Sequence, residues 1–162
     1  MDIIPSRRGV ASPYRTVLSA LEKRVPLPNI NPAYYHTLAL VLSILYLYAH
    51  TPAQKIVIVG IVLVADWLDG ATARRYKRGS RAGYIIDVVT DRASEAFIFA
   101  AEASTPLGQA FFLLWIINSA LAFRSIQTNT HTALPLRFAY LIVLIAHLFE
   151  GALWIPYPFG LV

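Results

Sequence analysis

The chain of 162 residues is 57% hydrophobic and only 14% charged, and it contains no cysteine. This composition excludes an ordinary soluble domain of this length, disulfide bonds and zinc sites built from cysteine, and it indicates a protein embedded in a lipid bilayer. The net charge of +5 favours an anionic membrane face and a phosphate-bearing substrate, whereas no nucleic acid partner is expected because basic and aromatic residues are not interleaved.

Residues 1–30 predict a cytoplasmic arm that contains one helix. Ser12 and Pro13 are typical of an N-cap and a first helical residue, and apolar side chains recur at helical spacing from Tyr14 to Leu21. This pattern favours an amphipathic interfacial helix that lies on the membrane surface, although a cap packed on the helix bundle also fits it. Because the segment lacks a continuous apolar core, we do not expect a cleaved signal.

Five apolar segments follow the arm, and each is long enough to cross roughly 30 Å of hydrocarbon as a helix. The tail, residues 151–162, is short and contains two prolines, so it predicts at most a broken sixth helix. The sequence therefore predicts one domain, residues 1–162, in which residues 31–162 form an all-α integral membrane bundle of five to six transmembrane helices. The five predicted spans are residues 33–49, 53–74, 83–102, 106–124 and 134–149.

Nearly all lysines and arginines fall on one side of these spans. Five precede the first span, five lie between the second and third, and Arg124 and Arg137 lie near the fourth connection, whereas Lys55 alone is on the opposite side. Short cytoplasmic loops retain such residues. The pattern therefore predicts a multi-pass protein of the cell membrane whose N-terminus and basic loop face the cytoplasm.

Four aspartates lie in the second and third spans, next to the basic loop. At about 100° per residue, each span carries its two aspartates on one stripe. If the two stripes face each other, four carboxylates converge and require cations. Oxygen ligands favour Mg²⁺ or Mn²⁺, and zinc is disfavoured because neither stripe holds a histidine; His36, at the start of the first span, is interpreted as unremarkable. The four aspartates are Asp66, Asp69, Asp87 and Asp91.

Small and basic residues accompany the aspartates. Gly70, Ala73 and Gly83 share the same stripes and let a phosphate or another helix approach the backbone. Arg74 lies one turn beyond the acids, and the basic loop with Ser80 offers further donors for a diphosphate. Together these residues favour a lipid diphosphate as the substrate. A purely structural ion-pair network between the second-span aspartates and Arg74 is the alternative.

The two stripes resemble the signature of the CDP-alcohol phosphotransferases, also called CDP-alcohol phosphatidyltransferases, at all eight specified positions. This resemblance implies a six-helix membrane domain, usually dimeric, in which an alcohol displaces CMP from a CDP-activated lipid. A homodimer is therefore expected, with a CDP-lipid and a small alcohol as substrates. The matching pattern, whose halves are eight residues apart, is Asp66-x-x-Asp69-Gly70-x-x-Ala73-Arg74 and Gly83-x-x-x-Asp87-x-x-x-Asp91.

The resemblance also implies roles for single residues. It makes the four aspartates the ligands of a divalent-metal site with two Mg²⁺ ions, and it makes Asp91 also the general base on the incoming hydroxyl. Gly70, Arg74 and Ser80 match positions that contact the CDP moiety. At the start of the first span, the family pattern Pro-Asn-x-x-Thr is only partly present, because no asparagine follows Pro32.

The acceptor alcohol differs among family members. Residues 91–95, DRASE, resemble the inositol-phosphate branch, and Arg124 and Arg137 are candidates to bind an acceptor phosphate. Alternatively, Arg92 pairs with Glu95 one turn away, and the other two arginines only anchor the protein at the cytoplasmic face. We favour inositol phosphate as the acceptor, with diacylglycerol phosphate or archaeol phosphate as the transferred group.

Three other functions fit the acidic spans less well. An intramembrane prenyltransferase would need a larger bundle with two separated acidic motifs. A carboxylate-based ion transporter would carry acids in both halves of the membrane and internal repeats. A non-catalytic scaffold would not need to retain the complete signature. The sequence therefore favours the phosphotransferase.

Overall fold

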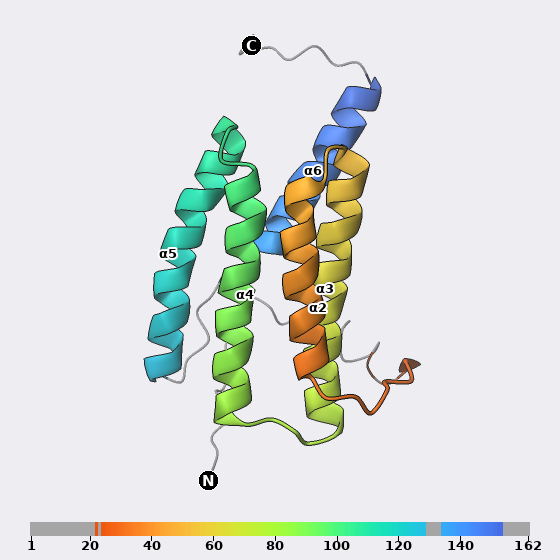
Figure 1. Cartoon of the computed structure of the whole chain (residues 1–162), viewed down its shortest axis with the longest axis vertical. Helices are drawn as coiled ribbons and strands as arrows, with labels where there is room; N and C mark the ends of the chain where they lie inside the picture. Colours follow the sequence, from red (N-terminus) through yellow and green to blue (C-terminus); the bar gives the residue numbers. More distant parts are fainter. Residues whose placement is uncertain (1–21, 23, 129–133, 154–162) are drawn as a thin grey trace.

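Every regular element in the described part of the chain is a helix, as the sequence predicts (Figure 1). The computed structural model describes residues 22, 24–128 and 134–153. The predicted amphipathic helix of the N-terminal arm lies outside these residues. The helices are α2 (Ala33–Leu45), continued by the 3-10 helix η1 (Tyr46–Tyr48), α3 (Pro52–Arg75), α4 (Arg81–Ala101), α5 (Pro106–Thr128) and α6 (Leu136–Leu153).

The five predicted spans coincide with helices, and α2 and η1 together form the first of them. The largest differences are at the C-terminal ends of α5 and α6, which continue for about a turn beyond the predicted residues. The tail prediction is wrong at its start, because residues 151–153 continue α6 instead of opening a separate segment. Residues 154–162 lie outside the described part of the chain, so a sixth membrane helix stays a prediction.

Side-chain caps fix where the two aspartate-bearing helices begin. At α3, the Thr51 hydroxyl accepts a hydrogen bond from Gln54 N at 3.2 Å, and the Gln54 side chain accepts one from Thr51 N at 3.1 Å. At α4, the Ser80 hydroxyl accepts a hydrogen bond from Gly83 N at 3.0 Å. These bonds satisfy backbone donors that the start of a helix leaves free. The caps thereby fix the residue at which each of these two helices begins.

Helix α2 lies between α3 and α4 and packs against both (Figure 1). Helix α5 packs against α4, and α6 packs against α3. Because α2 packs against both aspartate-bearing helices, it contributes to the space between their two aspartate stripes. Side chains from the first turn of α2 can enter that space.

Aromatic and aliphatic side chains fill the middle of the bundle. The rings of Phe99 and Phe111 are 5.4 Å apart, and the Tyr140 ring meets Phe99 nearly at right angles at 5.5 Å. Such ring pairs stabilise a core beyond the area that they bury. This core layer joins all of the helices except α2. Its buried members are Tyr46, Val59, Ile98, Phe99, Phe111, Leu136, Tyr140 and Leu144.

A polar cluster closes the end of the bundle opposite the α3–α4 connection. Lys55 Nζ lies 2.6 Å from Glu102 Oε1, and the Tyr46 hydroxyl donates to the same oxygen at 2.8 Å. The hydroxyls of Tyr46 and Tyr140 are 2.8 Å apart. We call these four residues the far-end cluster. Because they come from η1, α3, the end of α4 and α6, the cluster ties four elements together.

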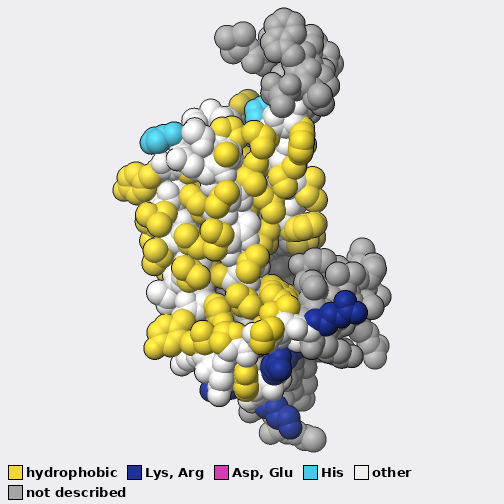
Figure 2. Space-filling model, turned by 90° about the vertical axis from the view of Figure 1, so that its right-hand side faces the viewer, with side chains coloured by type: hydrophobic (Ala, Val, Ile, Leu, Met, Phe, Trp, Pro, Cys, Tyr) yellow, Lys and Arg dark blue, Asp and Glu magenta, His cyan; other side chains and the backbone are white. Residues whose placement is uncertain are grey.

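Hydrophobic side chains cover the outside of the bundle between its two ends (Figure 2). By length and composition, α3 and α5 are long and apolar enough to cross a membrane, whereas α6 and α2 with η1 are shorter apolar helices. In the same view, lysine and arginine gather at the end that carries the α3–α4 connection. An apolar surface of this kind fits a lipid environment, while the number of membrane spans stays a prediction.

The start of α5 packs so tightly on the end of α4 that only glycine fits at position 108. A Cβ atom on Gly108 would lie 1.8 Å from the Glu102 carbonyl oxygen. We expect Gly108→Ala to lower the free energy of unfolding by roughly 1–3 kcal/mol through overpacking, measured by thermal unfolding in detergent micelles. Gly60→Ala is the matched control, because no atom lies within 4 Å of the added Cβ and alanine favours a helix. Equal melting temperatures for Gly108→Ala and the wild type would contradict this prediction.

Candidate active site

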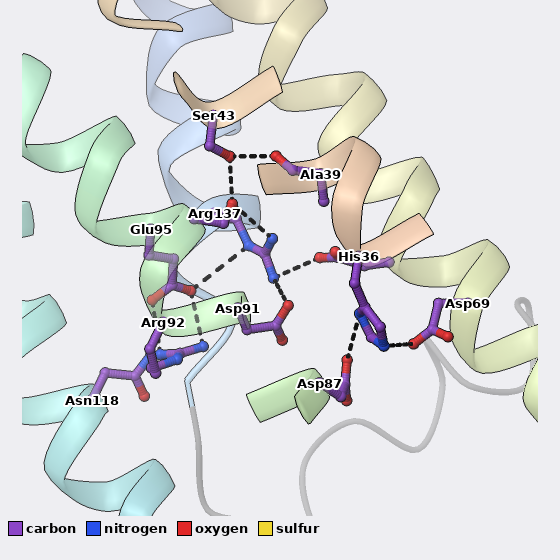
Figure 3. A network of polar contacts seen from close by, with 12 residues as sticks. His36, Ala39, Ser43, Asp69, Asp87, Asp91, Arg92, Glu95, Asn118 and Arg137 are labelled. Carbon is purple, nitrogen blue, oxygen red and sulfur yellow. Dashed lines mark hydrogen bonds and ion pairs between the residues drawn. The ribbon is translucent and has the colours of Figure 1, made fainter. Parts of the chain in front are cut away.

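The four predicted aspartates converge in two pairs, each with one residue from α3 and one from α4. Three of them, Asp69, Asp87 and Asp91, are labelled in Figure 3. A nitrogen-bearing side chain from another helix stands between the members of each pair. We call the two sets the arginine bridge and the histidine bridge. The arginine bridge is Asp66, Arg137 and Asp91, and the histidine bridge is Asp69, His36 and Asp87.

Arg137 of α6 is the buried cation of the arginine bridge, and its side chain is only 6% exposed. Its Nη2 atom lies 2.6 Å from Asp66 Oδ2 and 2.6 Å from Asp91 Oδ1. Its Nη1 atom donates to Ser94 Oγ at 3.4 Å, and its Nε atom lies 3.8 Å from Glu95 Oε1. A buried guanidinium is stable only with such partners, and its planar fork orients both aspartates in return.

His36 of α2 stands between the other two aspartates. Its Nε2 atom lies 3.5 Å from Asp69 Oδ2, and its Nδ1 atom lies 4.0 Å from Asp87 Oδ1. The interpretation of this histidine as unremarkable is therefore wrong. Ala39 and Ser43 lie on the same face one and two turns later and are buried. That stripe of small residues on an apolar helix is the sequence signal that could have placed His36 on the inner face.

A second ion pair lies beside the arginine bridge. Arg92 Nη1 lies 2.8 Å from Glu95 Oε2, one turn along α4, and both side chains are buried. The indole nitrogen of Trp115 donates to the Arg92 carbonyl oxygen at 2.9 Å and so ties α5 to this pair. The Arg92–Glu95 pair of the alternative interpretation is confirmed, but its other part, in which Arg137 only anchors the protein, is wrong, because Arg137 contacts two aspartates. Glu95 also faces Arg137, so it lies next to the arginine bridge. The sequence did not predict this position.

A cavity of about 510 Å³ lies next to the histidine bridge. Ser80 and Gly83, two residues predicted to bind the CDP-lipid, line it together with His36. A Cβ atom on Gly83 would lie 3.1 Å from the Ser80 hydroxyl oxygen, so glycine keeps this corner open. Asn31 and Arg78 add polar groups to the lining. Such a volume with a few polar groups is typical of a site for a small molecule.

The basic residues beyond the aspartates contact the segment that precedes α2. Arg78 donates to Asn29 Oδ1 at 2.7 Å. Arg74 forms an ion pair with Glu22, which is not the network with the second-span aspartates that the alternative reading required. A Cβ atom on Gly70 would lie 3.0 Å from Arg74 Nη1, so glycine leaves room for this arginine along α3. Both arginines thus hold the segment before α2 against the end of α3 and the α3–α4 connection.

Two predicted residues lie apart from the bridges. Ala73 is half-buried on α3, and Arg124 is exposed towards the end of α5. Among the described ion pairs of the site, none involves Arg124, whereas Arg137 contacts two aspartates. The structure therefore brings only one of the two candidate acceptor-phosphate arginines to the aspartates.

The donors of the histidine bridge fit a metal ion. One ligand atom from each of His36, Asp69 and Asp87 lies within 4.8 Å of the other two. Two atoms bound to one ion at roughly 2.1 Å are about 3 Å apart when adjacent and about 4.2 Å apart when opposite. Carboxylate oxygens and imidazole nitrogens are both common ligands of divalent cations. This Asp/His group could therefore hold a divalent metal.

Comparison with known proteins links the site to one family of enzymes. Residues 33–159 match the family model described as CDP-alcohol phosphatidyltransferase. Over 91 residues, the chain is 29% identical to the CDP-diacylglycerol–inositol 3-phosphatidyltransferase of Candida albicans. The alignment covers 56% of this chain and 39% of that relative, so it spans less than half of the relative's length. No solved structure matches the chain.

Proposed function

Since the chain belongs to the CDP-alcohol phosphatidyltransferase family, we propose that it transfers a lipid phosphate group from a CDP-lipid to a small alcohol and releases CMP. The observation that carries this proposal is the convergence of the four signature aspartates of α3 and α4 beside a cavity of about 510 Å³. Carboxylates can supply both metal ligands and a base, and a cavity of this size suits a nucleotide moiety. The reaction would serve phospholipid biosynthesis.

Divalent metal is part of the proposed site. We assign two Mg²⁺ or Mn²⁺ ions, which would neutralise the diphosphate and the charge that develops on the departing CMP. The carboxylates are suited to this role because their oxygens are the ligands that these cations prefer. The assigned ligands are Asp66, Asp69, Asp87 and Asp91.

Asp91 is the proposed general base. Its carboxylate takes the proton from the acceptor hydroxyl while the hydroxyl oxygen forms a bond to the phosphorus that carries the lipid. The bond between that phosphorus and the oxygen of CMP breaks, so the products are a phosphodiester lipid and CMP. Arg137, with its Nη2 atom 2.6 Å from Asp91 Oδ1, holds the carboxylate in a fixed direction.

The cavity is the proposed site of the CDP moiety. Ser80 and Gly83 line it, and Gly70 and Ala73 are the small residues of α3 that would let a phosphate approach once Arg74 moves away from Gly70. Arg74 would exchange its contact with the arm for an oxygen of the diphosphate, because both partners are anionic and the arginine is exposed. These five residues therefore form the proposed CDP-lipid site.

Inositol phosphate is the proposed acceptor. The Candida albicans relative is named for inositol, and residues 91–95 resemble the inositol-phosphate branch. Arg137 contacts the proposed base, so a phosphate bound by this arginine would bring the hydroxyls of the acceptor close to Asp91. Arg124 is the second candidate for the same phosphate. The transferred group is proposed to be diacylglycerol phosphate or archaeol phosphate.

The proposed location is the cell membrane, with several spans and with the active site and N-terminus facing the cytoplasm. The hydrophobic outer surface and the basic end at the α3–α4 connection support this orientation. In this orientation, the diphosphate of a CDP-lipid would lie near the membrane surface, at the end of the bundle that carries the basic residues. The family resemblance also supports a homodimer as the working assembly.

Release of CMP tests the proposed function. Purified protein in lipid nanodiscs receives Mg²⁺, CDP-diacylglycerol or CDP-archaeol, and one acceptor at a time: inositol phosphate, inositol, glycerol phosphate or serine. We expect CMP only when an acceptor is present, with inositol phosphate giving the highest kcat/KM. Absence of CMP with every acceptor would refute the proposed transferase activity. A preference for another alcohol would refute only the assignment of inositol phosphate as the acceptor.

A further inference from the structure

His36 brings a donor to the aspartates that the family signature does not contain. We propose that one ring nitrogen of His36 joins Asp69 and Asp87 as a metal ligand, so that the site favours Mn²⁺ over Mg²⁺ more than carboxylates alone would. This proposal rests on the metal site of the proposed function. It goes beyond that site in the type of ligand, because the family signature supplies only carboxylates whereas the structure adds an imidazole from α2 (Figure 3).

The packing of α2 sets the position of His36. The residue lies in the first turn of α2, and this helix packs against both aspartate-bearing helices. Ala39 and Ser43 continue the buried face, and their small side chains let α2 come close to its neighbours. The imidazole is only 13% exposed. It is therefore held between α3 and α4 instead of extending into solvent.

The distances around the ring suit an ion better than they suit direct hydrogen bonds. Separations of 3.5 Å to Asp69 and 4.0 Å to Asp87 are at or beyond the limit for a hydrogen bond. A single ring nitrogen and one oxygen of each carboxylate all lie within 4.8 Å of one another, close to the roughly 4.2 Å that separates two opposite atoms bound to one ion. A small shift of either side chain would therefore allow one nitrogen and both carboxylates to bind the same cation.

A ring nitrogen changes which metal the site prefers. Mg²⁺ selects oxygen ligands and keeps much of its water, whereas imidazole suits first-row transition metals. A neutral imidazole also adds a ligand without adding negative charge, so it does not increase the repulsion among the carboxylates. The ratio of Mn²⁺ affinity to Mg²⁺ affinity is therefore the property that His36 would control.

The test uses the full-length protein in lipid nanodiscs with Mn²⁺ as the probe. Pulsed electron paramagnetic resonance detects a nitrogen bound to Mn²⁺ through its magnetic coupling to the metal. We expect this coupling in the wild type and its loss in His36→Gln. The Mn²⁺ affinity of that variant should fall roughly tenfold or more, while its Mg²⁺ affinity, measured by competition, should change by less than about threefold.

His50→Gln is the matched control, because His50 is exposed just beyond η1, at the other end of the first span. This variant should keep the nitrogen coupling and both affinities. Wild-type protein that binds Mn²⁺ without nitrogen coupling would overturn the role of His36 and leave the carboxylate site standing. Wild-type protein that binds neither cation would overturn the metal site itself. If His36→Gln does not fold, the coupling in the wild type and in His50→Gln decides the question.

Discussion

Asp91→Asn is expected to lower the rate of CMP release by roughly 1,000-fold or more, because an amide cannot accept the proton of the acceptor hydroxyl. The substitution also removes one charged ligand from the proposed metal site. The fold should persist, since Arg137 keeps its contact with Asp66 at 2.6 Å and still faces Glu95. We therefore expect a large kinetic effect with only a small change in melting temperature.

Steady-state CMP release and thermal unfolding, measured on the same preparation, separate the two effects of Asp91→Asn. Glu102→Gln is the matched control, because it removes a carboxylate from the far-end cluster, where Lys55 pairs with it at 2.6 Å. This control should lower the melting temperature while the turnover of each folded molecule stays at the wild-type level. Turnover by Asp91→Asn close to that of the wild type would refute its role as the base.

Arg137→Ala is expected to have the largest effect on stability. Without the guanidinium, the carboxylates of Asp66 and Asp91 lose the cation that they share. Removal of one partner from a buried ion pair costs about 3–5 kcal/mol, and we expect about 3 kcal/mol because the two aspartates are still 24% and 26% exposed. Turnover should fall as well, since the proposed base loses the contact that orients it.

Unfolding in detergent micelles measures the effect of Arg137→Ala on stability. Arg124→Ala is the matched control, because it removes an exposed arginine and should change the free energy of unfolding by less than about 0.5 kcal/mol. Arg137→Lys keeps the charge without the planar fork, so it should recover more stability than turnover. An Arg137→Ala variant as stable as Arg124→Ala would contradict the arginine bridge, whatever happens to the acceptor KM.

The positions of the helices were predictable because long apolar runs mark them. The predicted span 53–74 differs from α3 by one residue at each end, since a Thr-Pro start and a basic end are strong boundary signals. The ends of α5 and α6 were predicted about a turn too early. Hydrophobicity marks only the part of a helix that suits lipid, whereas backbone hydrogen bonding continues beyond it.

The common face of the two aspartates on each helix was predictable too, because their spacing places them on one stripe whatever the tertiary structure is. The side chains that meet them were not. Arg137 lies 46 residues from Asp91, and His36 comes from a helix that carries no aspartate. The stripe of small residues marks the inner face of α2, but no local pattern in one sequence shows how α2 and α6 dock against α3 and α4.

The core layer also has an electrical consequence for the membrane in which we propose that the bundle lies. Charged side chains occupy both ends of the described bundle, and rings and aliphatic groups such as Ile98, Phe99 and Phe111 fill the space between them. Moving an ion through such a layer is very costly, because rings and aliphatic groups do not replace its hydration. If the bundle spans the membrane as proposed, this layer would therefore separate the charged groups at its two ends and oppose the leakage of ions between them.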